Sequence, residues 1–132
     1  MGLSGLLALY LGFRLKQLLC DFIQPSWVAM NKHQSLQGLG GRALFVHCGA
    51  HAVGTFILVM IFAPQLWWLA VIDFFVHASI DRFKAKFVHY KKWSMQTIKY
   101  WFIFGLDQEA HNLTHLSYVI LIFMTLNPDL TL

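Results

Sequence analysis

The chain has 132 residues, of which 58% are hydrophobic and only 12% are charged, and its mean hydropathy is +0.56. This length fits one domain over residues 1–132, and the apolar excess excludes a disordered chain and favours a membrane protein over a soluble one. The net charge of +4 comes largely from one loop, so it predicts orientation in a membrane and no nucleic-acid partner.

Four apolar segments follow one another along the chain, and each is close to the roughly 20 residues that a helix needs to cross a bilayer. Pro64 closes the second segment, and the pair Asn127-Pro128 closes the fourth. We therefore predict an all-α protein, a four-helix transmembrane bundle with spans at about 3–23, 43–62, 66–83 and 100–126.

The connections between the spans predict how the bundle lies in the membrane. The second and third spans are joined so closely that they must form an antiparallel hairpin, and a GLGG turn at 38–41 precedes the second. The loop after the third span is rich in lysine, and basic loops stay in the cytoplasm, so both termini are expected outside. Lysines and aromatic residues mix over 84–99, which fits a short basic amphipathic helix on the inner surface and fits an ordinary solvated loop equally well.

Each span carries a small set of polar residues spaced three or four apart, so that the members of a set share one helix face. With the spans antiparallel, the sets fall at one common depth near the cytoplasmic side. Ionisable residues inside a membrane are costly, so they usually face a partner, a cavity or a metal. The sets are Asp21 with Gln24, His47 with His51, His77 with Asp81, and Asp107 with His111.

Imidazole nitrogen and carboxylate oxygen from facing helices are ligands for zinc, manganese and iron. Four-helix proteins build metal sites from such paired side chains. We take zinc as the first choice, with manganese or iron as alternatives, and expect Gln24, His51 and Gln108 to orient the ligands or to join them. The predicted ligands are His47, His77, Asp81, Asp107 and His111.

A metal in this position would lower the pKa of a bound water and produce a nucleophile. Asp21 is the expected general base. Lys84 follows Asp81 by three residues on the same face, at the membrane surface, where it would bind an anionic group. These residues predict a metal-dependent hydrolase that acts on a lipid or phosphoester at the cytoplasmic leaflet.

Three other interpretations fit the same residues. The polar groups could form a hydrogen-bonded core that holds a small bundle together. The chain could be a non-enzymatic membrane module that binds a partner protein. It could also form a homo-oligomer that conducts ions or protons along a line from Asp81 through His77 to Asp73. Metal content separates the metal site from the rest, and oligomer size separates the last two.

Four further residues deep in the spans complete the interpretation. Arg14 and Asp73 lie at similar offsets from the polar layer, and we predict an ion pair between them that joins the first and third spans. Lys16 lies on the opposite face from Arg14, with snorkelling as its only explanation. His115 continues the face of His111 and fits a hydrogen-bonded core histidine.

The polar sets also carry a resemblance to a family of small bacterial and phage inner-membrane proteins of unknown function. The family pattern is D-F-x-x-Q, an early histidine on the second helix, H-x-x-x-D-x-x-K and D-Q-x-x-H. The resemblance implies a multi-span protein of the bacterial inner membrane, without an activity, and a looser similarity links the chain to membrane-bound metal-dependent hydrolases. Arg14, His51 and Asp73 lie outside the pattern. The matching residues are Asp21-Phe22-Ile23-Gln24, which is one residue shorter than the pattern, His47, His77 to Lys84, and Asp107 to His111.

Overall fold

The computed structural model describes residues 1–34 and 36–130, and within these residues the chain is helical, without strands. This confirms the predicted all-α class. The six-residue helix α2 was not predicted. The elements are α1 (Leu3–Phe22), α2 (Ser26–Asn31), α3 (Gly38–Phe62), the 3-10 turn η1 (Pro64–Leu66), α4 (Leu69–Lys91), α5 (Ile98–Leu126) and the 3-10 turn η2 (Pro128–Leu130).

Two of the predicted boundaries are wrong. The GLGG segment is not a turn before the second long helix, because α3 already begins at Gly38, whose φ of 63° only glycine adopts readily. The basic segment 84–99 is not a separate surface helix. Its first half continues α4 to Lys91, where Lys92 adopts a left-handed conformation that ends the helix. The apolar residues 87 and 88 keep the helical face of α4 partly buried, and this face extends the helix beyond the predicted span.

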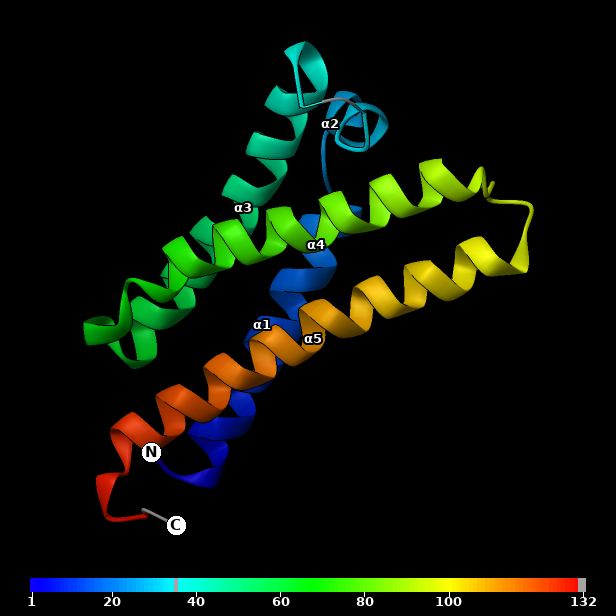
Figure 1. Cartoon of the computed structure of the whole chain (residues 1–132). Helices are drawn as coiled ribbons and strands as arrows, with labels where there is room; N and C mark the ends of the chain where they lie inside the picture. Colours follow the sequence, from blue (N-terminus) through cyan, green and yellow to red (C-terminus); the bar gives the residue numbers. More distant parts are fainter. Residues whose placement is uncertain (35, 131–132) are drawn as a thin grey trace.

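The four long helices pack in cyclic order, with contacts of α1 on α3, α3 on α4, α4 on α5, and α5 on α1. Both termini lie at the same end as the α3–α4 connection, while α2 and the α4–α5 connection lie toward the opposite end (Figure 1). The terminal amine of Met1 donates a hydrogen bond of 2.7 Å to Asn127 Oδ1 and so links the two termini. This antiparallel order brings the polar face of every long helix toward the others.

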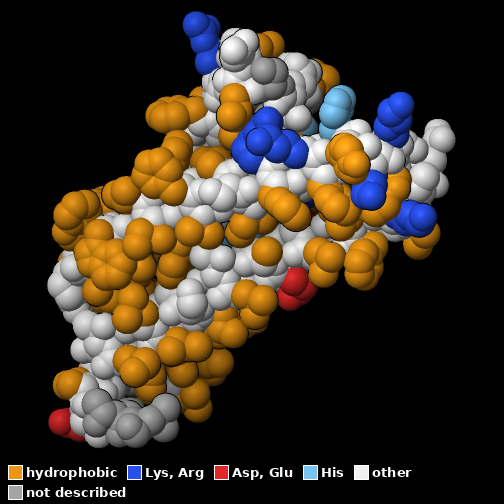
Figure 2. All heavy atoms as spheres, viewed as in Figure 1, with side chains coloured by type: hydrophobic (Ala, Val, Ile, Leu, Met, Phe, Trp, Pro, Cys, Tyr) orange, Lys and Arg blue, Asp and Glu red, His pale blue; other side chains and the backbone are white. Residues whose placement is uncertain are grey.

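Apolar and polar side chains divide the buried interior between them. An apolar cluster fills the end near the termini and includes Leu9, Phe13, Leu69 and Ile122. Beyond it, the buried side chains are mostly histidines, aspartates and lysines. The outer surface shows the reverse pattern, because large apolar residues on all four long helices are exposed. Figure 2 shows apolar side chains over most of this face, with lysines and arginines gathered toward the end that carries α2 and the C-terminal half of α4.

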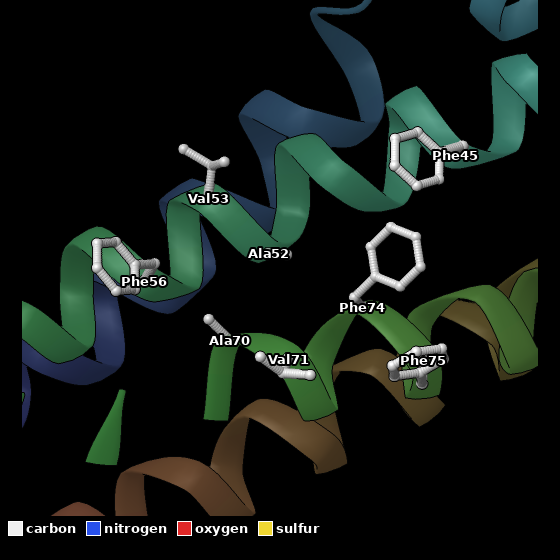
Figure 3. A pocket seen from close by; sticks show the side chains of 8 residues that line it. All are labelled: Phe45, Ala52, Val53, Phe56, Ala70, Val71, Phe74 and Phe75. Atoms are coloured by element: carbon white, nitrogen blue, oxygen red, sulfur yellow. The ribbon is translucent and has the colours of Figure 1, made fainter. Parts of the chain in front are cut away.

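Two of the described helices, α1 and α3, are long and apolar enough to cross a membrane. Of the other two long helices, α4 carries more charged residues than either of these, and α5 carries as many as α1 together with two histidines. An open apolar groove of about 420 Å³ runs along the outer side of α3 and α4 (Figure 3). The rings of Phe45 and Phe74 meet edge to face in it, with centroids 5.3 Å apart. None of its lining residues is charged or a histidine, so the groove is separate from the polar interior.

Candidate metal centre

Polar side chains from all four long helices meet inside the protein, in the half that lies away from the termini. Asp21 comes from the last turn of α1, and the other contributors come in pairs spaced four residues apart. The predicted convergence of the sets is therefore present. The pairs are His47 and His51 on α3, His77 and Asp81 on α4, and Asp107 and His111 on α5.

The first group of potential ligands consists of Asp21 with three histidines. Asp21 Oδ1 lies 3.4 Å from His47 Nε2 and 3.3 Å from His51 Nε2. His47 Nε2 lies 3.3 Å from His77 Nε2. One ligand atom from each of these four residues falls within 4.8 Å of all the others. His51, which was expected to orient the ligands or to join them, is one of the four residues of this group.

Two side-chain amides hold Asp21 in position. Gln17 Nε2 and Gln108 Nε2 both donate to Asp21 Oδ2, at 2.7 and 2.8 Å, which leaves Oδ1 facing the histidines. Gln108 was expected to orient the ligands or to join them, and here it contacts Asp21. Gln24 differs from expectation, because its amide donates to the backbone carbonyl of Asp21 and so closes the end of α1. Gln17 precedes Asp21 by one helical turn, so the spacing places it on the face of Asp21, but its hydrogen bond to Asp21 was not predicted.

The second group shares one histidine with the first. His77, Asp81 and His111 again offer ligand atoms within 4.8 Å of one another. His111 Nε2 lies 3.5 Å from Asp81 Oδ1, and the rings of His77 and His111 stack with centroids 3.9 Å apart. Asp81 Oδ2 also lies 3.3 Å from His47 Nε2, so the two groups adjoin. Two metal positions next to each other, with His77 between them, would fit this arrangement.

The distances between the donor atoms match those around a metal ion. Two ligands that bind a tetrahedral zinc at about 2.0–2.2 Å lie roughly 3.3–3.6 Å apart. The closest separations between donor atoms, 3.3–3.5 Å, fall in this range and exceed the usual length of a hydrogen bond. Several of these buried atoms also lack a hydrogen-bond partner among the described residues, which is costly unless something else binds them. They are both ring nitrogens of His51, His77 Nδ1, Asp81 Oδ2 and His111 Nε2.

Two lysines border the centre. Lys84 Nζ donates to Asp107 Oδ2 at 2.8 Å and lies 3.7 Å from Asp81 Oδ1. This contact draws Asp107 to the edge of the centre, so that the predicted ligand belongs to neither converging group. Lys32, at the end of α2, places Nζ 3.1 Å from His47 Nε2 and 3.9 Å from Asp21 Oδ1. Burial lowers the pKa of Lys32 below its usual value.

A second polar network lies between the centre and the apolar cluster, and it corrects the predicted ion pair. Asp73 binds Lys16 at 2.9 Å, whereas Arg14 is exposed. Thr55 Oγ1 donates to the same carboxylate oxygen at 2.7 Å, and His115 Nε2 lies 2.9 Å from Lys16 Nζ. Lys16 takes the place of Arg14 because the face of α1 that carries Lys16 is turned inward. The ammonium group of Lys16, for which snorkelling was the predicted explanation, is therefore buried and paired.

The fold and the site together define an all-helical protein with a buried centre of histidines and carboxylates. The chain belongs to the family described as protein of unknown function (DUF3307), whose model matches residues 9–131. This range contains every residue of the centre, and it confirms the resemblance to a family of unknown function. No curated protein and no solved structure shows a significant match to the chain.

Proposed function

We propose that this protein is an integral membrane metal-binding protein, with zinc as the first candidate and manganese or iron as alternatives. The observation that carries this proposal is the pair of adjoining ligand groups that share His77. The donor atoms of each group lie within 4.8 Å of one another and belong to buried residues, except for the half-buried Asp21. Several of them have no hydrogen-bond partner among the described residues. A purely structural polar core would be expected to pair these atoms with one another at hydrogen-bond lengths.

The distribution of polarity supports four membrane spans. Exposed apolar side chains lie on the outer faces of α4 and α5 as well as on those of α1 and α3. Among the ionisable groups of α4 and α5, the buried ones are Asp73, His77, Asp81, Asp107, His111 and His115, whereas Glu109 is exposed. Lipid can surround such helices, because their polar faces pack against one another. The lysine-rich end of the protein would lie in the cytoplasm of a bacterial cell, with the termini outside.

Cysteine labelling tests this topology. In a variant without Cys20 and Cys48, a cysteine introduced by Met95→Cys is expected to react with an impermeant maleimide only after the inner membrane is broken. The side chain of Met95 is 68% exposed in the α4–α5 connection. The matched variant Gly2→Cys should react in intact spheroplasts. Labelling of Met95→Cys in intact spheroplasts would reverse the proposed orientation.

The more specific form of the proposal is a metal-dependent hydrolase for a lipid or phosphoester. A bound divalent ion supplies Lewis acidity and an activated water. Asp21 Oδ1 faces the centre and is placed to accept a proton or to serve as a ligand. Lys84 stands at the edge of the centre with a side chain that is 13% exposed, where it can hold an anionic substrate group.

Hydrolysis is tested with protein reloaded with zinc, manganese or iron, against phosphomonoesters, phosphodiesters and phospholipids in mixed micelles. We expect metal-dependent turnover of at least one class. Lys84→Ala should lower it by roughly ten- to a hundredfold, because one charge-assisted hydrogen bond is lost. Lys86→Ala is the control, since Lys86 is exposed on the same helix. Metal-loaded protein that leaves the whole panel intact would refute the hydrolase and keep the metal site.

A further inference from the structure

Two cavities that share His33, Lys84 and Tyr100 in their linings lie between the basic surface and the candidate metal centre. The inner cavity, of about 170 Å³, is lined by Asp21 and Gln108 from the centre and by Lys32, His33 and Lys84. The outer cavity, of about 470 Å³, is lined again by His33 and Lys84, with Lys92 and Trp93 at its rim. The inner one has several times the roughly 30 Å³ that a water occupies, which is room for a tetrahedral oxyanion.

The charges around the inner cavity favour an anion once a metal is bound. Three carboxylates, from Asp21, Asp81 and Asp107, face the two ammonium groups of Lys32 and Lys84, so these side chains leave one negative charge. One divalent ion would change this balance to one positive charge, and two ions would change it to three. A net charge in a buried site is costly, so the loaded centre needs an anion.

The lysines can bind that anion without giving up their present contacts. An ammonium group has three N–H donors, and Lys84 Nζ uses one of them in its short contact with Asp107. Lys32 Nζ contacts His47 and Asp21 at longer distances. Both lysines come from outside the ligand groups and line the same cavity. Their position next to the metal ligands would let one oxyanion contact ammonium groups and metal together.

We propose that this basic passage is a phosphate-binding site, in which Lys32 and Lys84 hold a phosphate group next to the metal centre. The inference rests on the proposed metal function and names its ligand class. Free phosphate and the headgroup of an anionic lipid share this chemistry, and Lys92 and Trp93 line the outer cavity at the lysine-rich end. A cation at that end would attract either one.

Equilibrium dialysis with radiolabelled inorganic phosphate tests the proposal, after elemental analysis has established the metal content of the same sample. Metal-loaded protein in detergent is expected to bind about one phosphate. Lys84→Gln should weaken this binding tenfold or more, whereas Lys84→Arg, which keeps the charge, should retain most of it. Lys86→Gln, from the exposed side of α4, should bind like the unchanged protein.

A second arm separates the two sources of phosphate. Nanodiscs of phosphatidylcholine with phosphatidic acid are expected to displace the label if the ligand is a lipid headgroup, and nanodiscs of phosphatidylcholine alone should not. Displacement by neither, together with saturable binding, assigns the site to free phosphate. Metal-loaded protein that binds neither inorganic phosphate nor phosphatidic acid would overturn the inference and leave the metal site standing. Protein that takes up no metal would overturn both.

Discussion

His77→Ala is expected to remove all bound metal from the protein. His77 is the one residue that belongs to both ligand groups, so its loss leaves each group short of a donor. By contrast, His51→Ala and His111→Ala each remove a ligand from one group. The loss of a single ligand also lowers the affinity of the remaining ligands for the metal, because this affinity depends on a complete set of ligands. The unchanged protein should carry one or two equivalents of a divalent transition metal.

Elemental analysis of protein purified without added metal and without a metal affinity column measures this difference. The matched control is His89→Ala, since His89 lies on the same helix and is exposed. The double variant His77→Ala/Asp81→Ala extends the test by removing two of the three ligands of the second group. Equal metal content in the unchanged protein and in His77→Ala would show that the metal, if any, is bound elsewhere.

Asp73→Ala is expected to destabilise the protein by about 3–5 kcal/mol. The side chain of Asp73 is 1% exposed and that of Lys16 is 5% exposed, so the variant leaves an ammonium group buried without its counter-ion. Thr55 Oγ1 also loses the oxygen to which it donates. The double variant Lys16→Met/Asp73→Ala should be no worse than Asp73→Ala, because it removes both charges together.

Unfolding in mixed micelles with increasing SDS measures these free energies. Arg14→Ala is the control, because an exposed side chain should change stability by no more than about 0.5 kcal/mol. Additive losses for Lys16→Met and Asp73→Ala would mean that the two residues act independently. A large loss for Arg14→Ala would restore the ion pair that the spacing predicted.

The spacing of polar residues predicted the convergence of the centre, because residues four apart share a helix face and antiparallel helices fix the order of depth. The pairs of α3, α4 and α5 all follow this rule. The same rule misassigned α1. Arg14 was predicted to pair with Asp73, but Phe13 stacks on His115 and Lys16, on the opposite face from Arg14, is buried. Which of two opposite faces is buried depends on tertiary contacts that spacing does not contain.

The helical spacing of the sequence does not predict other residues of the site. Lys32 follows a helix of six residues, which is too short to show an apolar stripe, yet the position of α2 against α3 brings its ammonium group to His47. Asp107 was a predicted ligand, and it lies outside both ligand groups. The spacing did not predict its contact with Lys84 Nζ at 2.8 Å. Long flexible side chains reach partners that a helical wheel cannot predict.

X-ray absorption fine structure at the edge of the bound metal is the most direct test of the centre. The account predicts a first shell of nitrogen and oxygen at about 2.0–2.2 Å, with the outer-shell scattering of several imidazole rings and no sulfur near 2.3 Å. Sulfur would point instead to Cys48, which is buried on α3 next to His47. A sulfur shell, or an oxygen shell without imidazole, would contradict a metal held between His77 and its neighbours.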